Sequence, residues 1–378
     1  MGTVPGWDRK DRSRSNSRMK TTQEPTLGSE LQVAALAQLG TILGLLGRSE
    51  TWPGHSCGLN EAEYEELNHA IAVAHQQNNW FTETNVRNAL GAWAVALSDT
   101  ALRAWLNTYT DLVKPQKRQL TVGLVLAGNL PLVGWHDVLC VLLSGHKAKI
   151  KSSSQDHVLL PALITALDRL LPGSADLLEV TQGKLDKIDA VIATGSNNTS
   201  RYFEYYFKHI PRIVRKSRTS VAILDGTETP EELTGLGEDV FRYFGMGCRN
   251  VSKLYFPLDY DLDRVFNAIF PWKDIVNHNK YANNYDYQRA LWMLDQVAIL
   301  ENGFVLLKED TALASPMGAI YYERYQDLSK VEEQIAEQAD QIQCVVGHGH
   351  VPFGQSQFPA LNDYADGVDT MEFLLGLQ

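Results

Sequence analysis

Cys248 is the residue whose setting best suits covalent chemistry. It lies in the stretch 244–253, FGMGCRNVSK, which follows an aromatic-rich segment of helical character. A cysteine acts as a nucleophile only when its thiol is ionised and reachable. Gly245 and Gly247 leave room for a substrate carbonyl, and Arg249 favours the thiolate. On this stretch alone a buried structural thiol is an open alternative, because cysteine often packs as a small hydrophobe.

Asn129 is the second candidate. It ends the apolar run QLTVGLVLAGN and precedes Leu130 and Pro131, so its side chain is expected in a turn after a buried strand. An amide NH2 there can donate to an oxygen that becomes negative when a carbonyl is attacked. The alternative is an Asx-turn with no catalytic role.

Two further polar stretches suit a nucleotide. Lys151 is followed by three serines that end with Ser154, and hydroxyl and ammonium groups at a strand end suit ribose and phosphate. Gly195 and Ser196 open the expected helix NNTSRYFEYYF, whose N-terminal N–H groups would bind a pyrophosphate. The chain has no GxGxxG, so this is not the usual dinucleotide fingerprint.

Several other reactive side chains are expected to be structural. The cysteines other than Cys248 lie in a loop, an apolar helix and an apolar strand. The histidines of VVGHGHVPFG have no acid or cysteine at metal-ligand spacing, so we expect no metal and place them in a loop or at a pocket rim. His136 is expected to pack rather than to donate a proton, and the acids of DYADGVDT to serve as turn and cap residues. These residues are Cys57, Cys140, Cys344, His348, His350, Asp363, Asp366 and Asp369.

The bulk composition narrows the classes of protein to consider. The 378 residues are 44% hydrophobic and carry a net charge of −11, which indicates about two globular domains and argues against nucleic acid or an anionic membrane. The four cysteines are far apart, so a reduced, cytoplasmic setting is expected. No uninterrupted apolar run approaches a membrane span. Residues 1–28 are expected to be a disordered extension rather than a signal peptide, with Met19 as a candidate start.

The elements that must position these residues follow from hydrophobic periodicity. Residues 29–110 have the three- and four-residue spacing of helices. From residue 119 short apolar strands alternate with helices, which predicts a doubly wound parallel sheet within a domain covering 29–225. The turns AGN, KSSS and TGSNNTS follow strands, at the edge where such sheets bind ligands. A second α/β domain is expected over 226–348, and a segment over 349–378 that returns to the site or to an oligomer interface.

The order of these motifs resembles the aldehyde dehydrogenase superfamily, and more closely its LuxC-type acyl-CoA (fatty acyl) reductases. The resemblance covers about residues 100–378 and rests on AGNLPLVGW, SGHKAKIKSSS, KSRTSVAILDG, FGMGCRNVSKLYFP and FGQSQFPALNDYADGVDTMEFL. It implies an α/β, aldehyde dehydrogenase-like fold with a doubly wound parallel-sheet cofactor domain, a second α/β catalytic domain and a helical N-terminal region.

The resemblance also implies an activity, the reduction of an acyl thioester to an aldehyde with NADPH. Cys248 would accept the acyl group, and Asn129 with the Cys248 backbone N–H would form the oxyanion hole. Lys151, Gly195 and Ser196 would contact the cofactor. Ser154 stands where NAD-preferring relatives often carry a carboxylate, which favours NADP over NAD. The substrate would be an acyl-CoA or an acyl-carrier thioester, with an acyl-transferring or ligase partner and a homo-oligomeric state as further expectations.

One stretch departs from the pattern of hydrolytic aldehyde dehydrogenases, and one cofactor contact has only a candidate residue. Those enzymes carry a water-activating glutamate where this chain reads VRKSRTS, with Arg215, Lys216 and Arg218. This basic cluster could contact phosphate groups or form a solvated face. Glu309 is the candidate for the glutamate that holds the nicotinamide ribose. The alternatives are an aldehyde or semialdehyde dehydrogenase of the same fold, a cysteine acyltransferase or thioesterase without hydride transfer, and a protein that only binds.

Overall fold

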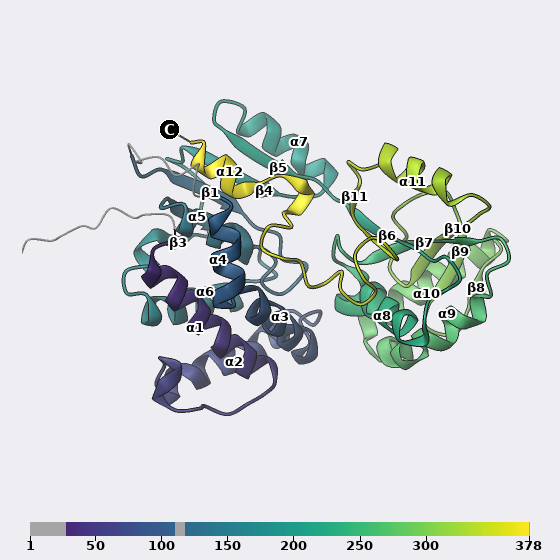
Figure 1. Cartoon of the computed structure of the whole chain (residues 1–378), viewed down its shortest axis with the longest axis horizontal. Coiled ribbons are helices and arrows are strands. Elements are labelled where there is room, and N and C mark those ends of the chain that lie inside the picture. Colours follow the sequence, from purple (N-terminus) through teal and green to yellow (C-terminus); the bar gives the residue numbers. More distant parts are fainter. Residues whose placement is uncertain (1–27, 110–117, 378) are drawn as a thin grey trace, which may run out of the picture.

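The computed structural model describes residues 28–109 and 118–377, which form two lobes lying side by side (Figure 1). The first lobe holds the N-terminal helices and a five-stranded sheet, and the second lobe is built on a six-stranded sheet. The predicted extension, residues 1–28, lies outside the described residues except for Gly28.

Four helices precede the first sheet, as their periodicity predicted. Two begin with capping boxes, formed by Ser29 with Gln32 and by Asn60 with Glu63. The helices are α1 (Glu30–Gly47), α2 (Glu61–Gln77), α3 (Glu83–Ala96) and α4 (Asp99–Asn107).

Helix α1 corrects one expectation about apolar segments. Its length and mean hydropathy of 1.4 would suffice for a membrane span, although polar residues interrupt its apolar sequence. In the structure α1 packs against α3, α4 and α6 (Leu159–Leu170), with Leu36, Leu39 and Leu43 fully buried. The apolar residues of α1 therefore pack in the core of the first lobe.

The first sheet is parallel throughout, with strand order β3-β2-β1-β4-β5. The chain winds outward from β1 to β3 and then returns to the other side of β1, so the order reverses between β1 and β4. The carboxyl ends of strands at such a point are where open α/β sheets bind ligands. The strands are β1 (Thr121–Val125), β2 (Lys147–Lys151), β3 (Leu178–Val180), β4 (Ala190–Thr194) and β5 (Arg212–Arg215), and the crossover helices include α5 (Trp135–Leu143) and α7 (Asn197–Tyr206).

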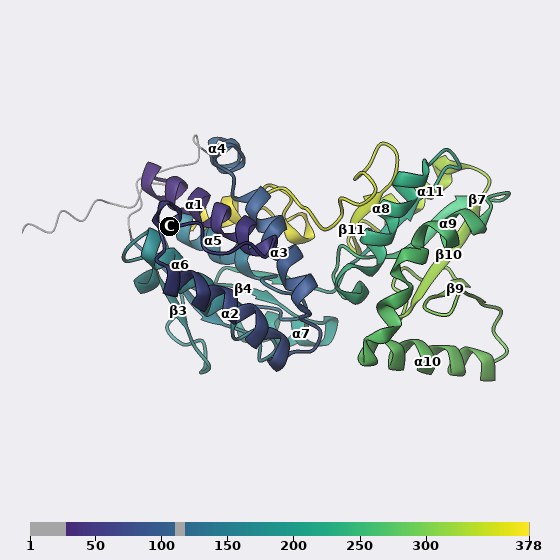
Figure 2. The same cartoon turned by 90° about the horizontal axis from the view of Figure 1, so that it is seen from below.

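The second sheet has the order β11-β6-β7-β10-β9-β8 and is parallel except for the β8–β9 pair. Alternate residues of β6 face opposite layers: Ala222 joins the core with α8, α9 and α10, and Val221 joins the core with α11. Figure 2 shows α10 and α11 on opposite sides of this sheet. The elements are β6 (Thr219–Ile223), β7 (Val251–Pro257), β8 (Leu300–Glu301), β9 (Leu306–Glu309), β10 (Ala319–Tyr325), β11 (Ile342–Val346), α8 (Pro230–Phe241), α9 (Leu262–Ile269), α10 (Asn279–Leu294) and α11 (Leu328–Glu337).

Three features of this arrangement differ from the sequence expectation. Strand β6 was expected in the first sheet but pairs with β7 and β11 in the second, so the lobes divide between Arg215 and Thr219 rather than at residue 225. The edge strand β5 and helix α11 were not predicted. A buried parallel strand has the same apolar pattern in either sheet, so local sequence could not assign β6.

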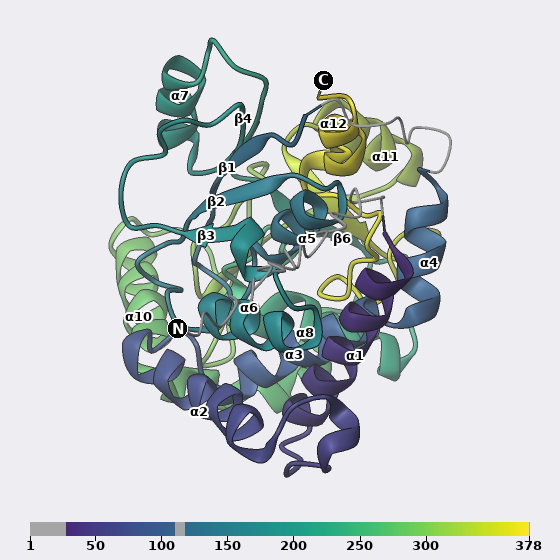
Figure 3. The same ribbon diagram turned by 90° about the vertical axis from the view of Figure 1, so that its left-hand side faces the viewer.

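The C-terminal segment crosses back from the second lobe to the first (Figure 1), and Figure 3, which views the molecule from the side of the first lobe, shows where the chain ends on that lobe. It ends in α12 (Thr370–Leu375), which packs on α5 and accepts a hydrogen bond at the Leu374 carbonyl from His146 Nε2 at 3.2 Å. Residues 351–365 thus pass beside the turn that carries Cys248, where Arg249 meets Asp363.

Candidate active site

The turn that carries Cys248 has a strained backbone. It lies between a short 3-10 helix, η4 (Arg242–Gly245), and β7. Tyr243, Phe244 and Gly245 have φ values of 54°, 61° and 73°. The left-handed region is unfavourable for bulky side chains, and such strain persists only where surrounding contacts hold it. The turn therefore needs strong local anchors.

Asn250 is the main anchor of this turn. Its buried side chain accepts a hydrogen bond at Oδ1 from the Gly247 N–H at 2.8 Å, and its Nδ2 donates to the Arg242 carbonyl at 2.8 Å. The same nitrogen lies 3.1 and 3.3 Å from the carbonyls of Asp239 and Val240. One amide thus ties the end of α8 to both sides of Cys248. Asn250 was not among the site residues predicted from the sequence, although it lies within the stretch 244–253.

Asn129 lies beside the same turn. Its Nδ2 donates to the Met246 carbonyl at 2.9 Å, two residues before Cys248. An amide nitrogen has two hydrogens, so one remains for another acceptor. Among the described residues the Cys248 backbone N–H also has no acceptor. The structure thus joins Asn129 to the turn that carries Cys248, although the two residues are 119 positions apart in the sequence.

The turn that carries Asn129 is held against the segment that follows β2. A Cβ on Gly128 would lie 2.4 Å from the Cβ of Ser153, so only glycine allows this approach. Asp156 accepts at Oδ2 from the Leu132 N–H at 3.1 Å, and Leu132 has a φ of 57°. Burial raises the pKa of Asp156 to about 6. Asp156 was also not predicted from the sequence.

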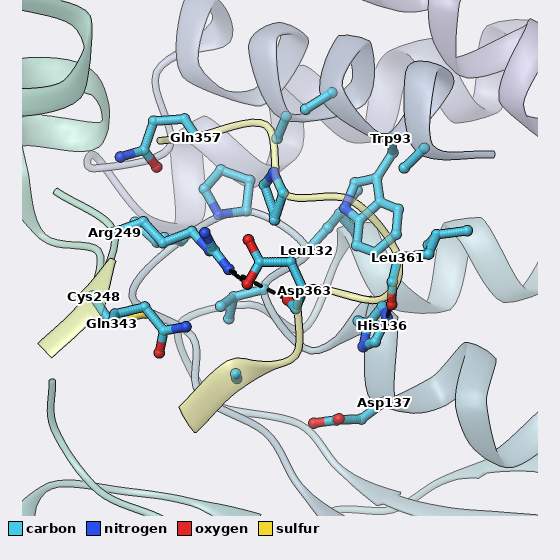
Figure 4. Close-up of a pocket in the computed structure, with 18 of the residues that line it drawn as sticks. Trp93, Leu132, His136, Asp137, Cys248, Arg249, Gln343, Gln357, Leu361 and Asp363 are labelled. Atoms are coloured by element: carbon cyan, nitrogen blue, oxygen red, sulfur yellow. Dashed lines mark hydrogen bonds and ion pairs between the residues drawn. The ribbon is translucent and has the colours of Figure 1, made fainter. Parts of the chain in front are cut away.

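Cys248 opens onto a cavity of about 190 Å³ that is mostly apolar (Figure 4). Three segments contribute most of its lining: α3, the turn after Asn129, and the C-terminal segment. The apolar lining residues include Ala89, Ala92, Trp93, Ala96, Leu130, Pro131, Leu132, Val133, Pro359, Ala360 and Leu361.

Burial raises the pKa of the Cys248 thiol, and the neighbouring Arg249 guanidinium opposes that rise. Arg249 is itself paired with Asp363 at 2.6 Å, which reduces its effect on the thiol (Figure 4). Cys344 lies on the other side of the turn: Ser220 Oγ donates to the Cys248 carbonyl at 2.9 Å and lies 3.1 Å from Cys344 Sγ. Cys57 and Cys140 are buried away from this turn.

The three basic residues at the end of β5 and just after it lie in different environments: internal contacts hold Arg215 and Arg218, whereas Lys216 is exposed. Arg215 is buried and binds Asp137 at 2.5 Å and Thr370 Oγ1 at 2.8 Å. Arg218 pairs with Asp366 at 3.3 Å and donates to two carbonyls at the end of α11 and the start of β11. These contacts join segments far apart in the sequence, which is why local pattern could not reveal them.

The acids of DYADGVDT also need correction. Asp369 caps α12, as expected for a cap residue. Asp363 and Asp366 instead form ion pairs with Arg249 and Arg218. The two carboxylates that line the cavity, Asp137 and Asp363, are therefore both paired with arginines.

The histidines were placed correctly only in part. Burial lowers the pKa of His136, whose Nε2 donates to the Leu361 carbonyl at 2.9 Å, so it packs in the cavity wall. His348 does have acids nearby, contrary to the expectation from spacing: it contacts Asp225 at 2.8 Å and Glu232 at 3.1 Å. Within residues 28–109 and 118–377, no group of three or more acidic, histidine or cysteine side chains is placed to hold a metal.

The predicted nucleotide contacts gather at one edge of the first sheet. Val125 at the end of β1 pairs in register with Lys151 on one side and Ala193 on the other. Lys151 and Ser154 are exposed, and in the described part of the chain the Lys151 ammonium has no acidic partner. Gly195 and Ser196 follow β4 across the point where the strand order reverses.

Ser196 caps α7 by accepting from the Thr199 N–H at 3.3 Å. A Cβ on Gly195 would lie 3.0 Å from the side chains of Thr199 and Phe203, so glycine allows α7 to start close to the strand. A lysine, exposed hydroxyls and a helix N-terminus at this edge fit a dinucleotide. Glu309 is exposed on β9. It lines neither the cavity at Cys248 nor the cavity beside Phe244 and Gly245.

Comparisons with known proteins agree with this geometry. A family model described as acyl-CoA reductase (LuxC) matches residues 58–261, just over half of the chain. A long-chain acyl-protein thioester reductase of Aliivibrio fischeri is 24% identical over 55% of this chain and 47% of its own length. A second, from Photobacterium leiognathi, is 23% identical over 51% and 43%. The chain spans about half the length of the curated relatives it matches.

Solved structures show the same fold. An indole-3-acetaldehyde dehydrogenase of P. syringae, solved with NAD+, aligns with a TM-score of 0.56 and 13% identity, covering 83% of this chain and 71% of that one. An NAD+ complex of a Mycobacterium tuberculosis aldehyde dehydrogenase aligns with a TM-score of 0.54 and 15% identity, covering 83% and 76%. The expected aldehyde dehydrogenase-like fold is confirmed.

Proposed function

The chain belongs to the LuxC family of acyl-CoA reductases, and we propose that it reduces an acyl thioester to an aldehyde through an acyl group held on Cys248. One observation carries the proposal. The Cys248 thiol opens onto an apolar cavity in which both carboxylates are paired with arginines. Such a cavity accepts an acyl chain, and the arginines oppose the use of either carboxylate as a base that activates water.

The first half of the reaction uses Cys248, the Asn129 amide and the Cys248 N–H. The Cys248 thiolate attacks the acyl carbonyl and forms a carbon–sulfur bond, while the sulfur of the donor leaves as a thiolate with the bonding electrons of the old thioester. During the attack the carbonyl oxygen becomes negative. The second Asn129 amide hydrogen and the Cys248 N–H are the donors available to stabilise it.

The acyl group then stays on Cys248, because arginines hold both carboxylates of the cavity. His136 donates to a carbonyl and its pKa is lowered by burial, so it too is poorly suited to activate water at Cys248. A nicotinamide bound at the first sheet would supply the hydride that reduces the thioester carbonyl. The oxyanion formed on Cys248 is stabilised by the same donors, and its collapse releases the aldehyde and the Cys248 thiolate.

Lys151, Ser154, Gly195 and Ser196 would hold the cofactor, and NADPH is the proposed form. Ser154 carries no charge, and the one acid close to it in sequence, Asp156, is buried and bound to the Leu132 N–H. Over residues 152–160, therefore, no exposed carboxylate is present to repel a 2′-phosphate. NAD would be used less well.

The acyl donor is proposed to be coenzyme A or an acyl-carrier protein, as the names of the relatives suggest. An acyl-transferring or ligase partner, a homo-oligomeric state and a cytoplasmic location are proposed with it.

Mass spectrometry tests the proposal. The protein is mixed with dodecanoyl-CoA without cofactor, digested and analysed for acylated peptides. We expect a dodecanoyl adduct on Cys248, which NADPH discharges as dodecanal. Asn129→Ala should slow adduct formation by about 100- to 1000-fold, the usual effect of losing one oxyanion donor.

The controls separate this activity from its alternatives. Cys344→Ser should leave the adduct unchanged, because Cys344 is a second thiol near the turn with no proposed role in acylation. Release of dodecanoate in place of aldehyde would indicate a thioesterase. Absence of any adduct on Cys248 with all acyl donors would refute the mechanism.

A further inference from the structure

A second apolar cavity adjoins the one at Cys248. It measures about 330 Å³ and is lined by α3, α4 and the C-terminal segment. Five residues line both cavities, and three of them are alanines: Ala92, Ala96, Pro359, Ala360 and Leu361. The partition between the cavities is therefore one layer of mostly small side chains.

The second cavity has the chemistry of a hydrocarbon site. No acidic or basic side chain lines it. The indole N–H of Trp105, one of its few polar groups, already donates to Tyr364 Oη at 2.8 Å. Its outer residues Val95 and Phe358 are 68% and 48% exposed, so this cavity reaches the surface. The first cavity, by contrast, is smaller than the roughly 300–1,000 Å³ of most ligand pockets.

The two cavities lie along one face of α3. Residues 89, 92 and 96 are three, four and seven positions apart, so they share a face of the helix. Ala89 lines only the first cavity, whereas Ala92 and Ala96 line both. The opposite face of α3 packs on α1, where a Cβ on Gly44 would lie 3.3 Å from Ala94.

Resting on the proposed function, we propose that the tail of an acyl group on Cys248 fills the first cavity and continues past Ala92 and Ala96 into the second. These two alanines then determine how long an acyl chain the enzyme accepts. A larger side chain at residue 96 would thicken the partition that the tail must cross, and residue 96 is not among the hydrogen-bond partners of the anchors Asn250 and Ser220.

Chain-length profiles test this assignment. We would measure kcat/KM with hexanoyl-, octanoyl-, dodecanoyl- and hexadecanoyl-CoA for the wild type, Ala96→Phe and the milder Ala96→Leu. Each methylene that loses its buried site should cost about fourfold in kcat/KM. We expect Ala96→Phe to lower the ratio of kcat/KM on hexadecanoyl-CoA to kcat/KM on hexanoyl-CoA by about 100-fold or more, with Ala96→Leu between it and the wild type.

Thr84→Phe is the matched control, because Thr84 is exposed on the same helix and lines neither cavity. Alkylation of Cys248 by iodoacetamide reports whether each variant keeps an intact turn. A folded Ala96→Phe with normal alkylation and an unchanged chain-length profile would overturn the assignment, as would an equal loss on every chain. If the wild type reduces none of the four substrates, the proposed function fails instead.

Discussion

At the scale of single residues, the environment of Cys248 suits a thiol that reacts only when a substrate arrives. Burial raises its pKa, and the neighbouring cation Arg249 is partly neutralised by Asp363. A thiol of raised pKa is a small fraction thiolate at neutral pH, although each thiolate is a stronger nucleophile. This balance protects the residue from alkylation and oxidation in the absence of substrate.

The pH dependence of alkylation follows from this raised pKa. Below its pKa the thiolate fraction of Cys248 rises about tenfold per pH unit, so the midpoint of its rate with iodoacetamide should lie above pH 8.5, about the pKa of an ordinary thiol. Arg249→Gln removes the group that lowers the pKa of Cys248, so the alkylation rate should rise at a still higher pH. The rate at Cys248 is followed by peptide mass spectrometry, with Cys248→Ser as the blank. A plateau below pH 8 would contradict this assignment.

At the scale of elements, two turns form the site and each is tied down by one buried polar side chain. Asn250 anchors the turn before β7, and Asp156 anchors the turn after β1. Both anchors bind backbone groups of neighbouring turns, so they fix the path of the chain. The positive φ values at Tyr243, Phe244 and Leu132 are tolerated because these hydrogen bonds oppose relaxation.

Asn250→Ala tests the first anchor. The substitution leaves the Gly247 N–H and the Arg242 carbonyl without their partner, which should lower the free energy of unfolding by about 1–3 kcal/mol. It should also slow acylation of Cys248 in protein that remains folded, because the turn relaxes. Asn284→Ala, at an exposed position of α10, is the control. Unchanged acylation in a folded Asn250→Ala would show that other contacts hold the turn.

At the scale of the whole molecule, the C-terminal segment completes the site. It supplies part of the cavity wall, the partner of Arg249 and, through Thr370, a partner of Arg215. The Arg215–Asp137 pair joins β5 to α5, and its contact with Thr370 adds α12. The returning segment and this buried pair therefore hold together parts of the chain that are distant in sequence.

Arg215→Met is predicted to destabilise the protein by about 3–5 kcal/mol, because it leaves the Asp137 carboxylate buried without its partner. Replacing both residues, as Arg215→Met with Asp137→Leu, should recover most of that loss. Urea denaturation measures both effects. If Arg215→Met instead left stability unchanged and weakened NADPH binding, the residue would be a phosphate contact after all.

The sequence alone predicted the fold class, nearly every helix and the main strands, because hydrophobic periodicity and caps are local properties. The family followed from the order of its short motifs. Local patterns could not assign β6 to a sheet, since a strand buried on both faces looks the same in either. They also could not reveal that Arg215 and Arg218 are internal ion-pair residues, or that Asn250 and Asp156 anchor the turns.

Those features depend on partners up to 155 positions away in the chain, or on backbone groups that every residue possesses. The sequence by itself thus determined which chemistry is available: a thiol, an amide and an apolar cavity-forming composition. Only the tertiary structure decided which charges are neutralised, which turns are held and which small side chains lie between two cavities, because each of these is set by contacts between distant segments.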